Sequence, residues 1–228
     1  MQPLRPNGDR ARAVKIMLCT MLIMELVSGA AAFSEMDLLL DVQRGVAIDE
    51  TAANMHDLMV GIIALIYAGV YIGTVITFIR WFRRAYFNLH QRVKHLEFKE
   101  EWAAGSWFVP FLNLVRPYRI MKELYVETRD LLARHNITQP GSLSTSLLGF
   151  WWAAWIIMGI VNNVSFRMSL RAETITQLLD SSSMDIAANV VSIPAGLLAL
   201  VVVGNYSKVE GLLFEVKEEA DVVASLGN

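Results

Sequence analysis

The chain has 228 residues, of which 54% are hydrophobic and only 18% are charged, and its formal net charge is −2. A soluble domain carries about 25% charged residues, so the shortfall argues against a soluble protein. The small net charge gives no support for nucleic-acid binding. Cys19 is the single cysteine, which excludes an internal disulfide framework and a thiolate zinc site.

Long uncharged runs predict membrane-spanning helices. A helix needs about 20 apolar residues to cross a hydrocarbon core about 30 Å thick. Residues 58–79 and 186–207 contain no charged side chain, and a third uncharged run contains residues 146–166. The sequence therefore predicts an all-α integral membrane protein, a single membrane domain over residues 1–228 with four spans at about 14–34, 58–79, 146–166 and 186–207.

The first predicted span, 14–34, has an alternative interpretation. Basic residues precede it and residues 30–32 are all alanine, a pattern that also suits a cleaved signal peptide. Glu25 argues against cleavage, because the apolar region of a signal peptide is normally uncharged. We therefore expect a retained helix.

The distribution of lysine and arginine predicts the orientation. Of the 20 such residues, 17 lie in residues 1–15, which include the start of the first span, in segment 80–140 or in the tail 208–228, and the other three are Arg44, Arg167 and Arg171. Cytoplasmic loops carry an excess of these residues. Both termini and segment 80–140 are therefore expected on the cytoplasmic side.

Segment 80–140 is too long for a plain connection and is expected to carry structure of its own. Its first part has apolar residues at alternating steps of four and three, which predicts one helical stripe: Phe82, Tyr86, Leu89, Val93 and Leu96. Such a stripe suits the headgroup zone of the inner leaflet, with its cations facing anionic lipid.

The middle of segment 80–140 predicts a break and then a second helix. Residues 103–115 are uncharged but too few to cross a bilayer, and Pro110 interrupts any helix there. We expect an interfacial or re-entrant segment, followed by a helix over about 116–135. The apolar face of that helix is predicted to be Met121, Leu124, Tyr125, Leu131 and Leu132.

Three strings in the chain carry a resemblance: PLRPN at 3–7, WFRRAYFNLH at 81–90 and WAAGSWFVPFLNLVRPYRIMKELY at 102–125. They resemble bacterial membrane proteins grouped as domain of unknown function 4328. The positions associated with the family motif are Gly105, Trp107, Pro110, Asn113, Pro117, Tyr118 and Glu123. The resemblance implies a four-helix protein of the bacterial inner membrane, and it implies no known reaction.

Glu25 is the first candidate site. It lies about 15 Å along a helix from Lys15, which places it near the bilayer midplane. An ionised carboxylate there costs roughly 2.5–3.5 kcal/mol. Two interpretations are open: a carboxylate that handles protons or cations, or a structural glutamic acid bonded to Tyr67, Tyr71 or a backbone carbonyl.

The second candidate site is the cationic and aromatic part of segment 80–140, expected to bind lipid headgroups or a partner protein. Its residues are Arg80, Trp81, Arg83, Arg84, Trp107, Pro110, Asn113, Arg116, Pro117 and Arg119. Ordinary anchoring of a cytoplasmic loop is the alternative explanation of its cations. Gly69 and Gly73 have the spacing of a close helix contact, either within the chain or in a homo-oligomer.

The sequence contains no nucleophile–base motif, phosphate loop, nucleotide fingerprint or metal-ligand spacing. We therefore expect no catalytic, cofactor or metal site, and a non-enzymatic membrane interaction or scaffold module. A small oligomeric transporter or channel that uses Glu25 is the alternative, and an intramembrane enzyme is the third. The expected partners are the lipid bilayer, anionic headgroups, and a second copy or another membrane protein, without nucleic acid.

Overall fold

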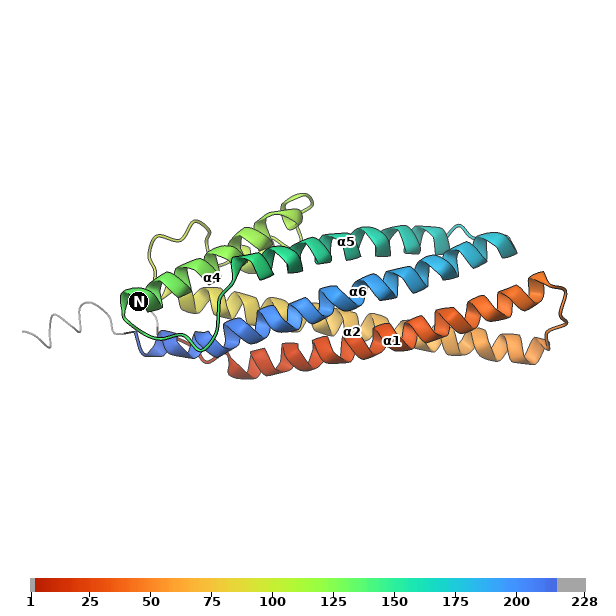
Figure 1. Ribbon diagram of the computed structural model, residues 1–228, viewed down its shortest axis with the longest axis horizontal. Coiled ribbons are helices and arrows are strands. Elements are labelled where there is room, and N and C mark those ends of the chain that lie inside the picture. Colours follow the sequence, from red (N-terminus) through yellow and green to blue (C-terminus); the bar gives the residue numbers. More distant parts are fainter. Residues whose placement is uncertain (1–2, 217–228) are drawn as a thin grey trace, which may run out of the picture. The chain divides into compact units, whose positions relative to one another are not determined.

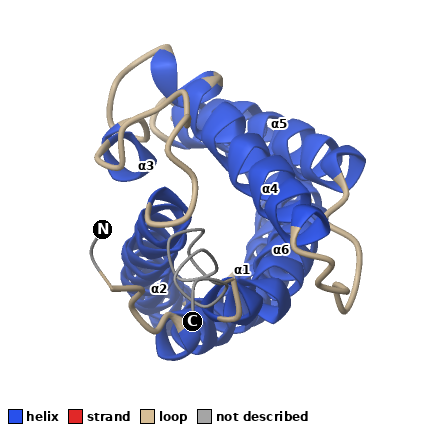
Figure 2. Ribbon diagram, turned by 90° about the vertical axis from the view of Figure 1, so that its left-hand side faces the viewer, coloured by secondary structure: helices blue, strands red, loops and turns tan. Residues whose placement is uncertain are grey.

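The computed structural model describes residues 3–216, and every regular element in this range is helical (Figure 1). The elements are α1 (Gly8–Gln43), α2 (Glu50–His90), α3 (Trp102–Gly105), η1 (Leu112–Leu114), α4 (Arg116–Arg134), α5 (Thr145–Ser169), α6 (Ile175–Glu210) and η2 (Gly211–Phe214). Figure 2 shows these helices joined by loops. The predicted all-α class is confirmed, and residues 217–228 of the predicted tail lie outside the described range.

Four helices are long and apolar enough to cross a membrane: α1, α2, α5 and α6. Each contains the whole of one predicted span, and α1, α2 and α6 have 36, 41 and 36 residues. At about 1.5 Å per residue these three are longer than a hydrocarbon core about 30 Å thick. The uncharged runs therefore predicted the helices but not their full lengths.

The described chain forms two compact units. The first contains residues 3–16, 75–150 and 200–216, and the second contains residues 17–74 and 151–199. Each unit has buried side chains of its own. Trp81 and Tyr125 are buried in the first unit, and Met24 and Ala188 are buried in the second.

Close helix contacts in the second unit are made at small residues. A Cβ atom added to Gly73 would lie 2.7 Å from Met17 Cε, and one added to Gly196 would lie 2.8 Å from Leu22 Cδ2. Gly73 of α2 and Gly196 of α6 therefore both pack against α1, as small residues do between apolar helices. Gly69 faces open space, so Gly69 and Gly73 do not serve one contact within the chain.

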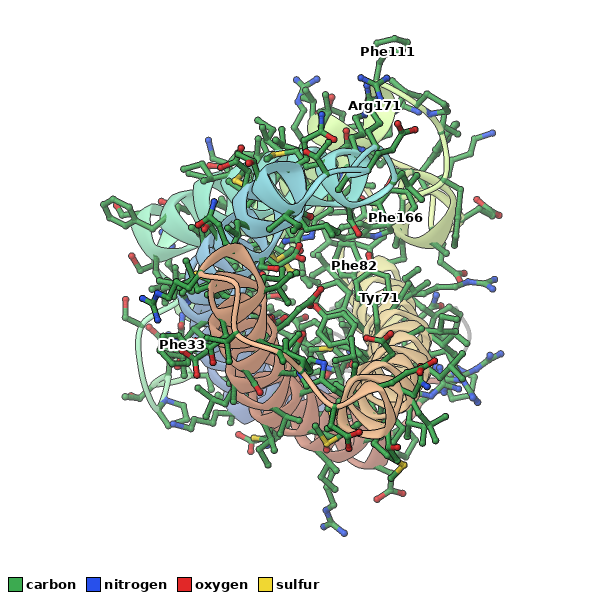
Figure 3. All side chains as sticks on the ribbon, turned by 90° about the vertical axis from the view of Figure 1, so that its right-hand side faces the viewer. Phe33, Tyr71, Phe82, Phe111, Phe166 and Arg171 are labelled. Atoms are coloured by element: carbon green, nitrogen blue, oxygen red, sulfur yellow. The ribbon has the colours of Figure 1, made fainter. Side chains whose placement is uncertain are left out.

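Large apolar side chains lie on the outside of the second unit. Leu65 is 76% exposed, and Phe33 and Phe166, labelled in Figure 3, are also exposed. Soluble proteins seldom expose contiguous apolar surface of this kind, whereas lipid chains solvate it. These exposures support the prediction that the helices cross a bilayer.

In the first unit, α4 packs through the face that its sequence predicts. Met121, Leu124 and Leu132 are fully buried, and the hydroxyl of Tyr125 donates a 2.7 Å hydrogen bond to the carbonyl oxygen of Val202 in α6. The helix ends where expected. Asn136 adopts a positive φ of 55°, and Ile137 N–H bonds to the Leu132 carbonyl, the pattern of a Schellman cap.

The helical stripe predicted over residues 82–96 is wrong in two respects. Helix α2 ends at His90, because the chain turns back so that Tyr86 and His90 both reach the carbonyl oxygen of Phe98, each at 3.0 Å. The stripe is also covered by protein, since Phe82, Tyr86 and Leu89 are fully buried. It therefore does not face lipid headgroups.

Residues 103–115 contain no long helix, as predicted. After α3 the chain turns at Pro110, and Phe111 takes a positive φ of 63°, a strained conformation for an aromatic residue. Phe111 is 85% exposed (Figure 3) and Phe108 is 72% exposed. We define the apolar segment as the exposed residues Phe108, Val109, Phe111, Leu114 and Val115.

Candidate functional site

Five arginines from distant parts of the sequence gather in the first unit. The pKa of Arg10 is lowered first by burial and then by the positive charges of its neighbours, Arg84, Arg80, Arg5 and Arg83. We call these five residues the arginine cluster. The guanidinium of Arg10 donates a 3.0 Å hydrogen bond to the carbonyl oxygen of Arg80, which joins the start of α1 to α2. Concentrated positive charge of this kind attracts anions.

Residues 3–7 are fixed against α2 by paired hydrogen bonds. The backbone N–H of Arg5 donates to Oδ1 of Asn88 at 3.0 Å, and Nδ2 of Asn88 donates to the carbonyl oxygen of Arg5 at 2.9 Å. One side-chain amide thus satisfies both backbone groups of Arg5. The guanidinium of Arg5 also lies over the ring of Phe87, 4.5 Å from its centre.

Glu210, at the end of α6, anchors the same region. Its carboxylate accepts hydrogen bonds from Nδ2 of Asn88 at 2.8 Å and from Nδ2 of Asn7 at 2.9 and 3.1 Å. Asn7 also donates to the carbonyl oxygen of Trp81 at 3.2 Å. All three polar side chains are buried. The network joins residues 3–7 to the ends of α2 and α6.

The burial of Glu210 affects its protonation. It lies beyond the predicted span 186–207 and is only 4% exposed. Burial raises the pKa of Glu210 to about 7, opposed by the amides of Asn7 and Asn88 and by the charge of Arg84. The carboxyl group therefore titrates near neutral pH.

Arg116 and Arg119 make contacts of a different kind. Arg116 lies over the ring of Trp102, 4.1 Å from its centre, and Arg119 pairs with Glu97 at 3.6 Å. Arg83 of the arginine cluster pairs with Glu100 at 3.2 Å. The loop 91–101 therefore offers one carboxylate to each of the two groups of arginines.

Two residues of the predicted headgroup site are covered by protein. Trp81 and Pro117 are buried, so their side chains cannot touch a lipid in this conformation. Trp81 packs against the rings of Phe78 and Tyr206. Its position at the end of an uncharged run indicated an interfacial tryptophan, but the protein itself covers it.

The other predicted members of that site lie nearer the surface. Arg80, Arg83, Arg119 and Pro110 are exposed, while Arg84, Trp107, Asn113 and Arg116 are partly exposed. The ring of Trp107 lies 5.5 Å from that of Phe78, and Phe78 belongs to the last turns of α2. This contact places Trp107, the residue before the apolar segment, against the helix that carries Arg80 to Arg84.

Glu25 meets one of its expected partners. The hydroxyl of Tyr67 donates a 2.8 Å hydrogen bond to Oε1 of Glu25, whereas Tyr71 is exposed. Glu25 is buried, and its Oε2 atom has no hydrogen-bond partner among residues 3–216. A structural bond to tyrosine is therefore present, and one carboxyl oxygen remains unsatisfied.

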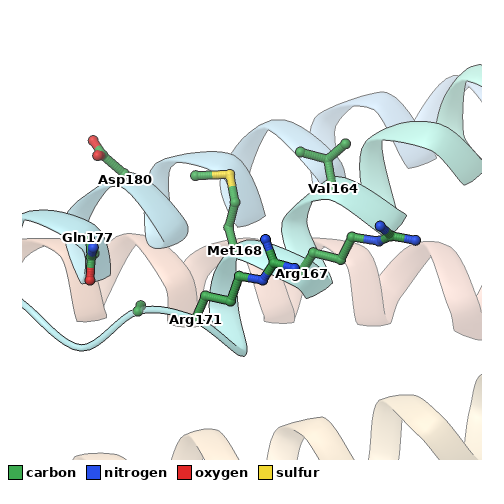
Figure 4. Close-up of a pocket in the computed structure, with 7 residues that line it drawn as sticks. Val164, Arg167, Met168, Arg171, Gln177 and Asp180 are labelled. Carbon is green, nitrogen blue, oxygen red and sulfur yellow. The ribbon is translucent and has the colours of Figure 1, made fainter.

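Polar side chains also join α5 to α6 in the second unit. Nδ2 of Asn162 donates to Oγ of Ser192 at 3.2 Å, and the hydroxyl of Ser165 donates to the carboxylate of Asp185. A shallow pocket of about 260 Å³ lies near the turn between these helices (Figure 4). Its lining includes the exposed side chains of Arg167 and Arg171.

Comparison with known proteins gave one positive finding. The sequence profile of the family described as "Domain of unknown function (DUF4328)" matches residues 44–208. The chain belongs to this family. No curated protein and no solved structure matched significantly. The matched range includes the family strings at 81–90 and 102–125, and it leaves the string at 3–7 outside.

The geometry gives a structural role to Glu123, one of the residues that carry the resemblance to DUF4328. Its carboxylate accepts hydrogen bonds from the hydroxyl of Tyr86 and from the backbone N–H of Glu97. Burial raises the pKa of Tyr86, so the hydroxyl keeps the proton that it donates. Glu123 therefore holds the loop 91–101 against α2 and α4.

Sequence reasoning on this family member missed the network of Asn7, Asn88 and Glu210. Asn7 and Asn88 stand inside the strings PLRPN and WFRRAYFNLH, but only as part of a resemblance. Glu210 is the first acidic residue after the fourth predicted span. An acidic residue at that point is common at the end of a membrane helix and gives no sign of a special role. Its hydrogen bond with Asn7, 203 residues away, cannot be inferred from local sequence pattern.

Proposed function

We propose that this protein is a non-enzymatic, four-span membrane module whose cytoplasmic side binds the headgroups of anionic phospholipids. The arginine cluster carries the proposal. Five cations brought together from residues 5–10 and 80–84 suit a phosphate ligand better than dispersed anchoring charges do. The orientation follows the lysine and arginine bias of the sequence.

The apolar segment supports the same proposal. Phe108 and Phe111 are among the most exposed apolar residues of the first unit, and they follow a tryptophan that packs on α2. Aromatic residues beside cations are typical of the boundary between headgroups and acyl chains. We propose that this segment enters the inner leaflet while the arginine cluster binds headgroup phosphate.

A titration with short-chain lipids tests the function. The full chain in dodecyl maltoside is titrated with dioctanoyl-phosphatidylglycerol, and the double variant Arg80→Gln/Arg84→Gln is compared with Arg129→Gln/Arg134→Gln, which removes two arginines of α4 outside the cluster. Each cation near an anionic headgroup contributes about 1 kcal/mol. We expect the first pair to weaken binding about thirtyfold and the second pair to change it less than twofold.

Two controls identify the ligand. Dioctanoyl-phosphatidylcholine should bind more weakly than the anionic lipid, and inorganic phosphate at millimolar concentration should not displace the lipid. Equal losses in both double variants would show a bulk charge effect and would contradict the proposal. Displacement by phosphate would assign the site to a free anion instead of a lipid.

Proton or cation transport through Glu25 is the second candidate. The buried, unpartnered Oε2 atom is the observation that favours it. In liposomes that contain the full chain and a pH-sensitive dye, this role predicts a proton flux that Glu25→Gln abolishes and Tyr71→Phe leaves intact. A flux that Glu25→Gln does not change, or the lack of any flux, would leave Glu25 with its structural bond to Tyr67 alone.

A further inference from the structure

We propose that Asn88 and Glu210 are positioning residues, which hold residues 3–7 in place and thereby complete the arginine cluster. The inference rests on the proposed lipid-headgroup function and adds how that site is assembled. Neither residue is expected to touch lipid, since both are buried.

Asn88 holds the backbone of Arg5 against α2 through hydrogen bonds. A primary amide has a donor and an acceptor in one plane, so it can pair with the N–H and the carbonyl of another residue as a peptide group does. Asn88 uses both groups on Arg5 and still donates to Glu210. A side chain of the same shape without polar atoms would leave the backbone of Arg5 without these bonds.

Glu210 fixes the second point of attachment. Its carboxylate receives the amides of Asn7 and Asn88 together, so residue 7 and the end of α2 are held by one group. Arg5 and Arg10 lie on either side of Asn7 in the sequence. Holding Asn7 therefore restricts both arginines, and Arg10 then reaches the carbonyl oxygen of Arg80.

The same arrangement makes the docking sensitive to pH. The ionisable group that acts on Glu210 is Arg84 of α2, Glu210 in turn acts on Tyr206 of α6, and Asn7 and Asn88 are neutral donors. Burial raises the pKa of Glu210 to about 7. Below pH 7 the group is neutral and burial costs little. Above pH 7 the group ionises, and because burial outweighs the amides of Asn7 and Asn88 and the charge of Arg84 in setting its pKa, hydration of Glu210 and release of residues 3–7 become more favourable.

Hydrogen exchange of the full chain in dodecyl maltoside tests the docking without any lipid. Pro3 and Pro6 have no amide hydrogen, so a peptide over residues 1–7 reports mainly on Leu4, Arg5 and Asn7. We expect Asn88→Leu to speed exchange of the Arg5 amide at least tenfold. Glu210→Gln keeps an acceptor and should preserve protection, and Glu215→Gln, at an exposed neighbouring site, is the matched control.

The pH dependence separates positioning from general stability. After correction for intrinsic rates, exchange in the unaltered chain should be slower at pH 6 than at pH 8, and Glu210→Gln should remove this difference. Unchanged protection in Asn88→Leu, or a pH difference that persists in Glu210→Gln, would overturn the inference.

Lipid affinity completes the test. Asn88→Leu should weaken dioctanoyl-phosphatidylglycerol binding about fivefold, Arg5→Gln should weaken it by the same factor, and Asn88→Leu should cause no further loss when Arg5→Gln is already present. If Arg80→Gln/Arg84→Gln weakens binding but Asn88→Leu does not, the positioning role is wrong while the proposed function stands. If neither weakens it, the proposed function fails and the positioning role falls with it.

Discussion

A single carboxylate, Glu210, joins segments of the chain that are 122 and 203 residues apart in sequence. Because it is buried, its ionisation affects the stability of the fold. The pKa is raised from the ordinary 4.5 to about 7, so the folded state keeps a proton that the unfolded chain releases. The contribution that this retained proton makes to the stability of the folded state is full below pH 4.5, declines as the pH rises to 7, and is absent above pH 7.

Glu210→Gln should remove this pH dependence. We expect the variant and the unaltered chain to have similar melting temperatures near pH 4.5. Between pH 4.5 and pH 7 the variant should become progressively more stable than the unaltered chain. Above pH 7 the difference in the free energy of unfolding between the variant and the unaltered chain should be constant, at most about 3 kcal/mol. Thermal melts in detergent over pH 4.5–8.5 measure it, with Glu215→Gln as the control. If the melting temperatures of Glu210→Gln and the unaltered chain differed by the same amount at every pH, the assigned protonation of Glu210 would be contradicted.

At the residue scale, sequence pattern located some groups but not their partners. Its acidic side chain inside a predicted span singled out Glu25, and Tyr67 was one of its expected partners. Asn88 and Glu210 gave no such signal, since polar residues beyond a span are common. Their roles depend on three helix ends meeting, which is a property of the tertiary fold.

At the scale of helices, the small residues of α6 differ in what they contact. Gly196 faces Leu22 of α1 closely, whereas Gly204 has no atom within 4 Å of a Cβ position. Gly196→Leu should therefore destabilise the protein by about 1–3 kcal/mol through overpacking, and Gly204→Leu should not. Both sites lie inside one helix, so helix propensity changes equally.

The melting temperature in dodecyl maltoside measures the difference between the two leucine variants. Equal effects of Gly196→Leu and Gly204→Leu would show that the contact of α6 with α1 at Leu22 is not formed as described. A smaller side chain at the same site, Gly196→Ala, should have an intermediate effect, because the end of Leu22 can move.

Hydropathy and proline positions predicted the elements better than helical periodicity did. Apolar runs located α1, α2, α5 and α6, and Pro110 marked the break that precedes α4. Periodicity failed beyond His90, because Tyr86 and His90 bind the carbonyl oxygen of Phe98 and the chain turns back. It also could not distinguish a stripe covered by protein from one facing headgroups.

At the scale of the whole molecule, the proposed function requires that four helices cross a bilayer with segment 80–140 on the cytoplasmic side. The exposed apolar side chains of the second unit support insertion. The orientation rests on 17 of the 20 lysine and arginine residues. A lipid-binding role for the arginine cluster depends on both statements.

Cysteine labelling in intact cells that express the chain tests this topology most directly. In a Cys19→Ala background, a membrane-impermeant maleimide is added to Glu173→Cys, in the turn between α5 and α6, and to Arg134→Cys, at the end of α4. We expect that Glu173→Cys reacts in intact cells and that Arg134→Cys reacts only after the membrane is permeabilised. Labelling of Arg134→Cys in intact cells would contradict the proposed orientation.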